Sequence, residues 1–151
     1  YSNKLPTIHR LLKVHPDRAR LYRFVADAPT TTMQRIKGIT TGGLPTFVDC
    51  GSNFASEAIE EDNFLKQLAA GGGNASMMGD DTWMGLFPRT FHRSHPFPSF
   101  NVRDLDTVDR GVRSVIQSEM DRDDWTMLIA HYLGVDHCGH RYGPDHPAMA
   151  V

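Results

Sequence analysis

The spacing of apolar residues predicts helices that alternate with short buried strands. The segments with helical spacing are 8–12, 32–39, 57–70 and 108–120. The segments whose apolar residues alternate or run together, as in strands, are 19–26, 75–78 and 125–133. The 87–100 stretch, rich in Phe, Pro and His, favours a loop. Strands that alternate with helices predict an α/β domain with a largely parallel central sheet flanked by helices.

The composition fits a single folded domain and excludes several kinds of partner. Hydrophobic residues make up 40% of the 151 residues, enough for a sizeable core. The 16 basic and 18 acidic residues are interspersed and leave a net charge of −2, too weak a field to hold nucleic acid or an anionic membrane by charge alone. No apolar run approaches the roughly 18 residues of a membrane span. Cys50 and Cys138 are too few for a disulfide scaffold and allow one bridge at most.

The two ends of the chain indicate a piece of a longer protein. The chain starts at Tyr1 without an initiator methionine or a signal peptide. It ends at Val151, shortly after a Pro-Asp-His-Pro stretch that is typical of the start of a further helix. We therefore expect one domain, or part of one, over residues 1–151.

The densest group of chemically capable residues is Asp136-His137-Cys138-Gly139-His140, directly after a predicted strand. If the segment makes one helical turn, Asp136 and His140 face the same way, and His137 and Cys138 point elsewhere. A carboxylate and an imidazole suit Zn²⁺ or, less specifically, Mn²⁺. Zinc takes three or four protein ligands, so the others must come from elsewhere. The alternative is a polar loop whose histidines cap backbone groups.

Other polar residues stand where the carboxyl ends of parallel strands would place a ligand. Thr30, Thr31 and Thr32 precede a helix whose first N–H groups favour an anion, and a threonine hydroxyl can serve there as a nucleophile if a metal lowers its pKa. The alternative is an ordinary helix cap. Asn53 could donate to a phosphoryl oxygen or hold a turn. The pair Asp80-Asp81 could bind a metal or a substrate ammonium, or could simply begin a helix.

Three long stretches carry a resemblance to a known family: Pro29–Phe47, Met78–Trp83 and Leu128–Pro144. Through them the chain resembles the GPI ethanolamine phosphate transferases, membrane enzymes of the alkaline phosphatase superfamily. The motifs PTTTMQR, FNVRD and GVDHCGH look most like the branch of that family that modifies the third mannose of the GPI glycan. The resemblance implies an alkaline-phosphatase-like fold, incomplete here at both ends.

The resemblance also assigns roles to single residues. It implies that Thr32 is the nucleophile and a metal ligand, with Thr30 and Thr31 as alternatives. It implies that Asn53 binds phosphate and that Asp136 and His140 are ligands of one of two divalent metal ions, zinc or manganese. The family's upstream aspartate and its downstream Asp-His pair and further histidine have no counterpart in this sequence. We therefore expect the segment alone to be inactive.

The activity implied by the resemblance is transfer of phosphoethanolamine from phosphatidylethanolamine to a mannose of the GPI anchor precursor, through an ester on threonine. The whole protein would be embedded in the endoplasmic reticulum membrane, with this domain on the lumenal side, and would have a small membrane partner subunit. Its membrane-spanning segments would lie outside this sequence. Two alternatives stay open: a metal-dependent phosphodiesterase that gives the phosphoryl group to water, and a non-catalytic lumenal domain that binds head groups.

Overall fold

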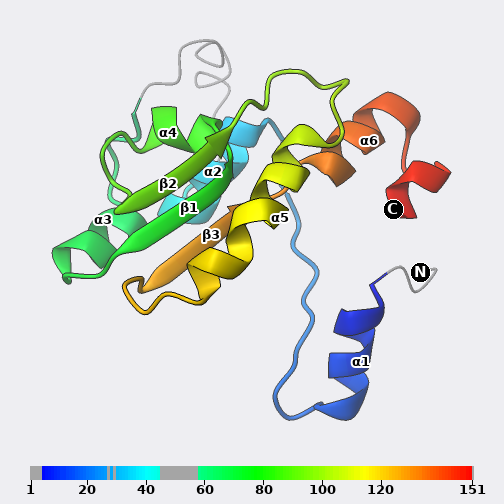
Figure 1. Ribbon diagram of the computed structural model, residues 1–151, viewed down its shortest axis with the longest axis horizontal. Coiled ribbons are helices and arrows are strands. Elements are labelled where there is room, and N and C mark those ends of the chain that lie inside the picture. Colours follow the sequence, from blue (N-terminus) through cyan, green and yellow to red (C-terminus); the bar gives the residue numbers. More distant parts are fainter. Residues whose placement is uncertain (1–4, 27, 29, 45–57, 151) are drawn as a thin grey trace.

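A computed structural model describes residues 5–26, 28, 30–44 and 58–150, and its centre is a three-stranded sheet (Figure 1). The strands are β1 (Ala75–Asp80), β2 (Arg93–Phe97) and β3 (Met127–His131). Their order is β2-β1-β3, and both neighbouring pairs are parallel. In this register Met78 of β1 lies between His95 and Ala130. The predicted α/β class and the parallel sheet are confirmed.

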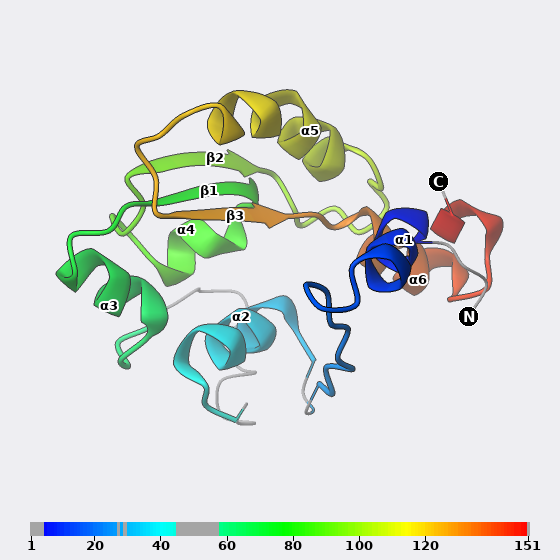
Figure 2. The ribbon, with the colours of Figure 1, turned by 90° about the horizontal axis from the view of Figure 1, so that it is seen from below.

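Helices cover both faces of the sheet (Figure 2). One face carries α5 (Thr107–Met120), and the other carries α2 (Thr32–Thr41), α3 (Phe64–Ala70) and α4 (Thr82–Leu86). Successive residues of a strand point to opposite faces, and Met77 and Met78 are therefore both fully buried, in different cores. The core under α5 contains Met78, Val108, Val112 and Leu133. The opposite core contains Met33, Ile36, Ile59, Leu65, Ala75, Met77, Trp83, Leu86 and Phe87.

The remaining helices lie toward the ends of the chain. The helix expected over 8–12 is α1 (Pro6–Val14), and none of its residues is buried. Helix α6 (Gly134–Tyr142) follows β3 beyond its carboxyl end and is succeeded by a short 3-10 helix, η2 (Pro147–Ala150). Across the described part of the chain, none of the helices combines the length and the apolar character that crossing a membrane requires.

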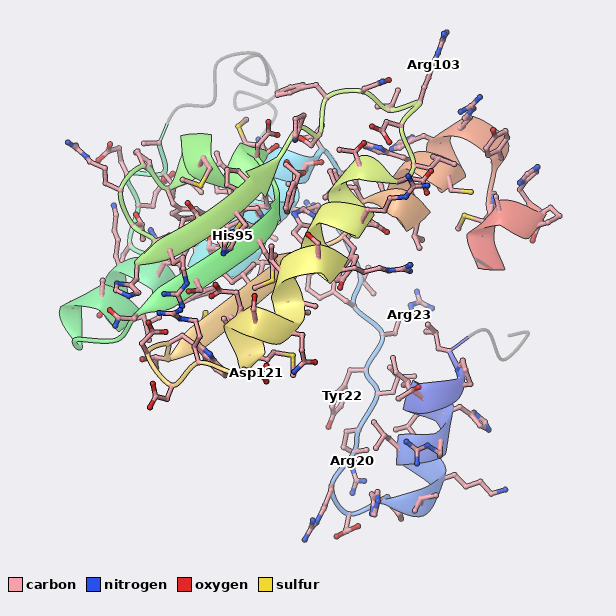
Figure 3. The ribbon with its side chains drawn as sticks, viewed as in Figure 1. Arg20, Tyr22, Arg23, His95, Arg103 and Asp121 are labelled. Atoms are coloured by element: carbon pink, nitrogen blue, oxygen red, sulfur yellow. The ribbon has the colours of Figure 1, made fainter. Side chains whose placement is uncertain are left out.

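The strand predicted over 19–26 is wrong. These residues form no strand and no helix, and Tyr22 and Phe24 are 82% and 72% exposed. In Figure 3, Arg20, Tyr22 and Arg23 lie on an extended segment that stands away from the sheet. Alternating polarity is a local property, but a strand also needs a neighbour for its N–H and C=O groups. The described chain provides none for this segment.

Two further expectations need correction. The 87–100 stretch contains β2, because an edge strand tolerates Pro96, which a central strand would not. The helix expected over 57–70 begins only at Phe64, because the Asn63 side chain caps it by accepting a hydrogen bond from the Lys66 amide at 3.0 Å. Ile59 is buried outside that helix, and its amide donates to the Leu86 carbonyl at 2.9 Å.

Gly79 lets β1 and β3 approach each other just before the carboxyl edge of the sheet. Its φ is +128°, a conformation that residues with a side chain rarely adopt. A Cβ at this position would lie 2.1 Å from the His131 carbonyl oxygen. The residue before Asp80 must therefore be glycine for the two strands to pair as they do.

Candidate active site

A cavity of about 480 Å³ opens at the carboxyl edge of the sheet. The predicted site residues on its wall are Thr30, Thr31, Thr32, Asp80, Asp81, Asp136 and His140. They come from the start of α2, the end of β1 and the helix after β3. The topology thus brings together three groups that are far apart in the sequence. Asn53 lies outside the described residues.

Asp136 and His140 lie one turn apart on α6, as the sequence predicts. Asp136 Oδ2 and His140 Nε2 are 3.5 Å apart, and the two side chains are 60% and 70% exposed. This distance suits a shared cation, because two ligands about 2.1 Å from a tetrahedral metal lie about 3.4 Å from each other. Carboxylate oxygen and imidazole nitrogen are also ligand types that zinc and manganese accept.

Asp136 and His140 alone would make up only part of a metal coordination shell. Among the residues that the structure describes, no group of three or more His, Cys, Asp or Glu side chains is placed to hold a metal ion. The donor set therefore fits two ligands of one cation, and a complete site needs further ligands.

His137 lies on the same cavity wall, although the helical spacing predicts that it points elsewhere. It is 5% exposed, and its Nδ1 is 2.8 Å from the Asp104 carbonyl oxygen. Because a carbonyl only accepts, Nδ1 carries the proton and donates it. Asp104 itself is fixed by the chain that follows it: hydrogen bonds from Thr107 and from the Asp106 amide lower the pKa of Asp104 to about 2.

Cys138 lies on the buried side of α6, whereas Asp136 and His140 are exposed. Its side chain is 2% exposed and its thiol is free. A sulfur buried in this way does not face the cavity that Asp136 and His140 line. Cys50, its only conceivable partner in the sequence, lies outside the described residues.

Thr31, at the start of α2, does not cap the helix with its side chain as a threonine at this position usually does. Thr31 occupies the N-cap position, but among the described residues its side chain makes no capping hydrogen bond and its buried Oγ1 has no partner. The Thr31 carbonyl accepts the hydrogen bond from the Arg35 amide at 3.0 Å, so the helix itself is regular from its first turn. The ordinary-cap interpretation of these threonines is therefore wrong for Thr31. In the part of the chain that the structure describes, the N-cap residue of α2 therefore leaves the first N–H groups of the helix without a side-chain cap.

The acidic pair at the end of β1 divides into a buried and a half-buried carboxylate. Asp80 is 1% exposed, and its Oδ1 accepts a hydrogen bond from the Thr82 amide at 2.8 Å. Asp81 accepts a hydrogen bond from the Ser99 hydroxyl at 2.6 Å. Ser99 and Phe100 follow β2 and line the same cavity. They escape prediction because β2 itself is taken for a loop.

A second cavity of about 300 Å³ adjoins the first and shares Thr30, Thr32 and Asp136 with it. On its wall the Trp83 indole N–H donates to His131 Nδ1 at 2.9 Å. Burial lowers the pKa of His131 and outweighs the opposite effect of Asp80 and two other carboxylates. The imidazole is therefore held neutral, with its remaining proton on Nε2.

Comparison with known proteins gives relatives that match nearly the whole chain. Human GPI ethanolamine phosphate transferase 3, catalytic subunit, is 58% identical over 150 residues, which are 99% of this chain. GPI ethanolamine phosphate transferase 3 of Saccharomyces cerevisiae is 49% identical over 99% of the chain. Human GPI ethanolamine phosphate transferase 2, catalytic subunit, is 44% identical over 85%.

The match covers only a part of each relative. The chain spans 14% of the length of the human transferase 3 and 15% of the yeast protein. No family model matches the chain. No solved structure matches it either. Identity of 49% to 58% over 99% of this chain nevertheless shows that the chain and these relatives share a common ancestor. The chain belongs to the family of the GPI ethanolamine phosphate transferases.

Proposed function

We propose that the protein carrying this chain transfers phosphoethanolamine from phosphatidylethanolamine to a mannose, the third, of the GPI anchor precursor. One observation carries the proposal: Thr32, Asp136, His140 and Asp81 line one cavity at the carboxyl edge of a parallel sheet. A nucleophile, a pair of metal ligands and a carboxylate for an ammonium group are what this reaction requires. The relatives bear names of the same activity.

The reaction proceeds in two displacements on phosphorus. Thr32 Oγ attacks the phosphodiester, its hydroxyl proton departs, and the bond to diacylglycerol breaks. Diacylglycerol leaves with a proton, and phosphoethanolamine stays on Thr32 as an ester. A mannose hydroxyl then attacks the same phosphorus and loses its proton, the bond between phosphorus and Thr32 Oγ breaks, and the threonine oxygen takes up a proton to become a hydroxyl again. The uncapped N–H groups of α2 and the Asn53 amide stabilise negative charge on the phosphoryl oxygens.

Asp136, His140 and Thr32 would hold divalent cations, zinc or manganese, together with ligands outside this sequence. When bound, such cations neutralise charge on the attacking and leaving oxygens. The 3.5 Å separation of the Asp136 and His140 side chains supports this role.

Asp81 is the residue we propose for recognising the ammonium group of the donor. Asp80, its buried neighbour in the sequence, lines the same cavity. The Ser99 hydroxyl fixes the Asp81 carboxylate, and exposed Phe100 adds an aromatic ring to the same wall. A carboxylate and an aromatic face both attract a cation. Asp81→Asn should raise the donor KM about tenfold and change kcat little. An unchanged KM would remove Asp81 from the donor site.

The nucleophile is tested with Thr32→Ala in the full-length enzyme. We expect transfer to fall by at least roughly a thousandfold, because no other group takes the phosphoryl ester. Thr41→Ala, at the other end of α2, is the matched control, since the Thr41 hydroxyl donates to the Lys37 carbonyl and accepts from the Gly43 amide, and Thr41 does not line either cavity described above. Thr30→Ala and Thr31→Ala test the two alternatives. Full activity in Thr32→Ala would move the nucleophile elsewhere.

The acceptor is tested with a purified GPI intermediate and phosphatidylethanolamine. A gain of one phosphoethanolamine on the third mannose supports the transferase, whereas free phosphoethanolamine without a change in the glycan identifies a phosphodiesterase. Binding of the lipid head group without either product identifies a non-catalytic domain. We also propose that the whole protein resides in the endoplasmic reticulum membrane and assembles with a small membrane subunit, consistent with the catalytic-subunit name of the human relative.

A further inference from the structure

The start of α6 is capped by a residue from another helix. Leu133, at the N-cap position, offers no capping side-chain hydrogen bond of its own. Asp109 of α5 accepts hydrogen bonds at Oδ1 from the Leu133 amide at 2.8 Å and from the Gly134 amide at 3.0 Å. A carboxylate that accepts two N–H groups at a helix N-terminus gains from hydrogen bonding and from the helix dipole.

The contact depends on a glycine. A Cβ on Gly134 would lie 2.6 Å from Asp109 Oδ2 and 2.9 Å from the Leu105 carbonyl oxygen. The carbonyl belongs to the backbone and cannot turn away as a side chain can. Any larger residue at this position would therefore push α6 away from α5.

Two more contacts tie α6 to the chain just before α5. His137 donates from Nδ1 to the Asp104 carbonyl at 2.8 Å, and Arg141 donates to the Arg103 carbonyl at 3.0 Å. Figure 3 shows the Arg103 side chain pointing away from the protein, so only its carbonyl serves the contact. Residues 103–109 thus hold α6 along its length, from Leu133 to Arg141.

The held face and the free face of α6 carry different residues. Leu133, His137 and Cys138 are buried, whereas the side chains of Asp136 and His140 are 60% and 70% exposed. The cavity is lined from both sets, by Leu133 and His137 as well as by Asp136 and His140. On a helix, rotation about its axis moves both faces together. The contacts that hold the buried face of α6 therefore also determine the direction in which the Asp136 and His140 side chains point.

We propose that Asp109 is a positioning residue: its carboxylate sets the orientation of α6 and thereby the placement of Asp136 and His140 for their cation. The part concerning the cation rests on the proposed function. The part concerning α6 rests on the contacts of Asp109 alone.

The test compares Asp109→Ala and Asp109→Asn in the full-length enzyme. Asparagine still accepts from both amides without the charge, whereas alanine removes the cap. We expect hydrogen exchange of the α6 amides to quicken in Asp109→Ala, affinity for Zn²⁺ or Mn²⁺ to fall about tenfold, and kcat to fall with the donor KM unchanged. Asp109→Asn should recover most of each property. Asp106→Asn, one turn away and 66% exposed, is the matched control.

Gly134→Ala perturbs the contact between Asp109 and the start of α6 by changing α6 instead of α5. This variant keeps the proposal testable if Asp109→Ala fails to fold. It should also weaken metal binding and lower kcat at constant donor KM. Faster α6 exchange with wild-type metal affinity and kcat would reduce Asp109 to a structural cap and overturn the proposal. Unchanged α6 exchange would overturn it too. A wild-type enzyme that binds no cation and transfers nothing would instead refute the proposed function, and α6 exchange would still decide whether Asp109 orients the helix.

Discussion

At the amino edge of the sheet, charged side chains pair with one another, whereas at the carboxyl edge several polar groups point into a cavity. Arg93, at the start of β2, donates from Nε to both carboxylate oxygens of Glu119 at 2.8 Å and from its terminal nitrogens to Asp124. His95 lies 3.0 Å from the same Glu119 carboxylate, and Figure 3 shows it on β2. At the opposite edge Thr31 Oγ1 is buried, and no described residue pairs with it.

Hydrogen bonds to the backbone also satisfy polar groups at the amino edge. The Asn74 side chain donates to the Asp124 carbonyl at 3.1 Å, and the Asn74 carbonyl accepts from the Thr126 amide at 2.8 Å. Polar groups that satisfy each other contribute to stability and leave nothing for a ligand. The comparison teaches that the two edges of one sheet can differ: polar groups satisfy one another at the amino edge, and the proposed chemistry lies at the carboxyl edge.

The largest effect that would test this division is expected from His140→Ala. The imidazole is 70% exposed and, within the described residues, its ion pair is with Asp136, so its loss should leave the unfolding transition unchanged. Bound metal should drop, and transfer should fall by at least about a hundredfold. Metal content by mass spectrometry and a transfer assay measure both.

The matched control for that prediction is His92→Ala. His92 lies at the amino edge, where its Nε2 is 3.8 Å from Asp124. The His92→Ala enzyme should bind as much metal as the wild type and should keep its transfer activity. Unchanged metal stoichiometry in His140→Ala would remove that residue from the metal site.

A smaller effect, on stability rather than activity, is expected from Glu119→Gln. Glu119 is only 4% exposed, and the substitution removes the charge that Arg93 and His95 share. We expect the free energy of unfolding to fall by about 2 kcal/mol at neutral pH, with kcat unchanged. Denaturant unfolding measures it, with exposed Asp121→Asn as the control. A loss of activity without a loss of stability would contradict the division between the edges.

The smallest expected effect is on how the difference in free energy of unfolding between the wild type and Glu119→Gln changes with pH. Burial raises the pKa of Glu119, but hydrogen bonds and charge from Arg93 and His95 outweigh burial and hold it below its ordinary value of 4.5. On acidification the unfolded chain therefore takes up its proton first, so this stability is present above the ordinary pKa and is lost as pH falls through the lowered one. The wild type should therefore begin to lose its advantage over Glu119→Gln as the pH falls to 4.5, and should lose more of it at lower pH. A difference that stays constant as the pH falls further would contradict the assignment.

Much of the fold could be predicted because most elements bury one apolar side. The periodicity over 108–120 and the apolar run at 75–78 place α5 and β1 to within a few residues. β2 could not be found, because its sequence RSHPF is polar and lies at an edge, where pairing rather than burial makes it a strand. The 19–26 segment shows the reverse: it alternates but has no neighbour.

In the candidate site, too, relations between residues that are close in the sequence could be predicted, and relations between distant residues could not. The spacing of Asp136 and His140 is local, so one helical turn suffices to predict that they face the same way. Asp109 precedes Leu133 by 24 residues, and Asp104 precedes His137 by 33, so no spacing rule connects them. Only the packing of α5 on the sheet brings these residues to α6.

The chain contains two tryptophans, and each reports on a different edge of the sheet. The Trp83 indole donates to His131 beside the cavities, and the Trp125 indole donates to the Glu119 carbonyl at 2.9 Å. Replacing either one by phenylalanine leaves a single tryptophan in this chain, at the other edge. Fluorescence can therefore follow the arrival of a ligand at one end and the loosening of the ion network at the other as two separate optical signals, without an added dye.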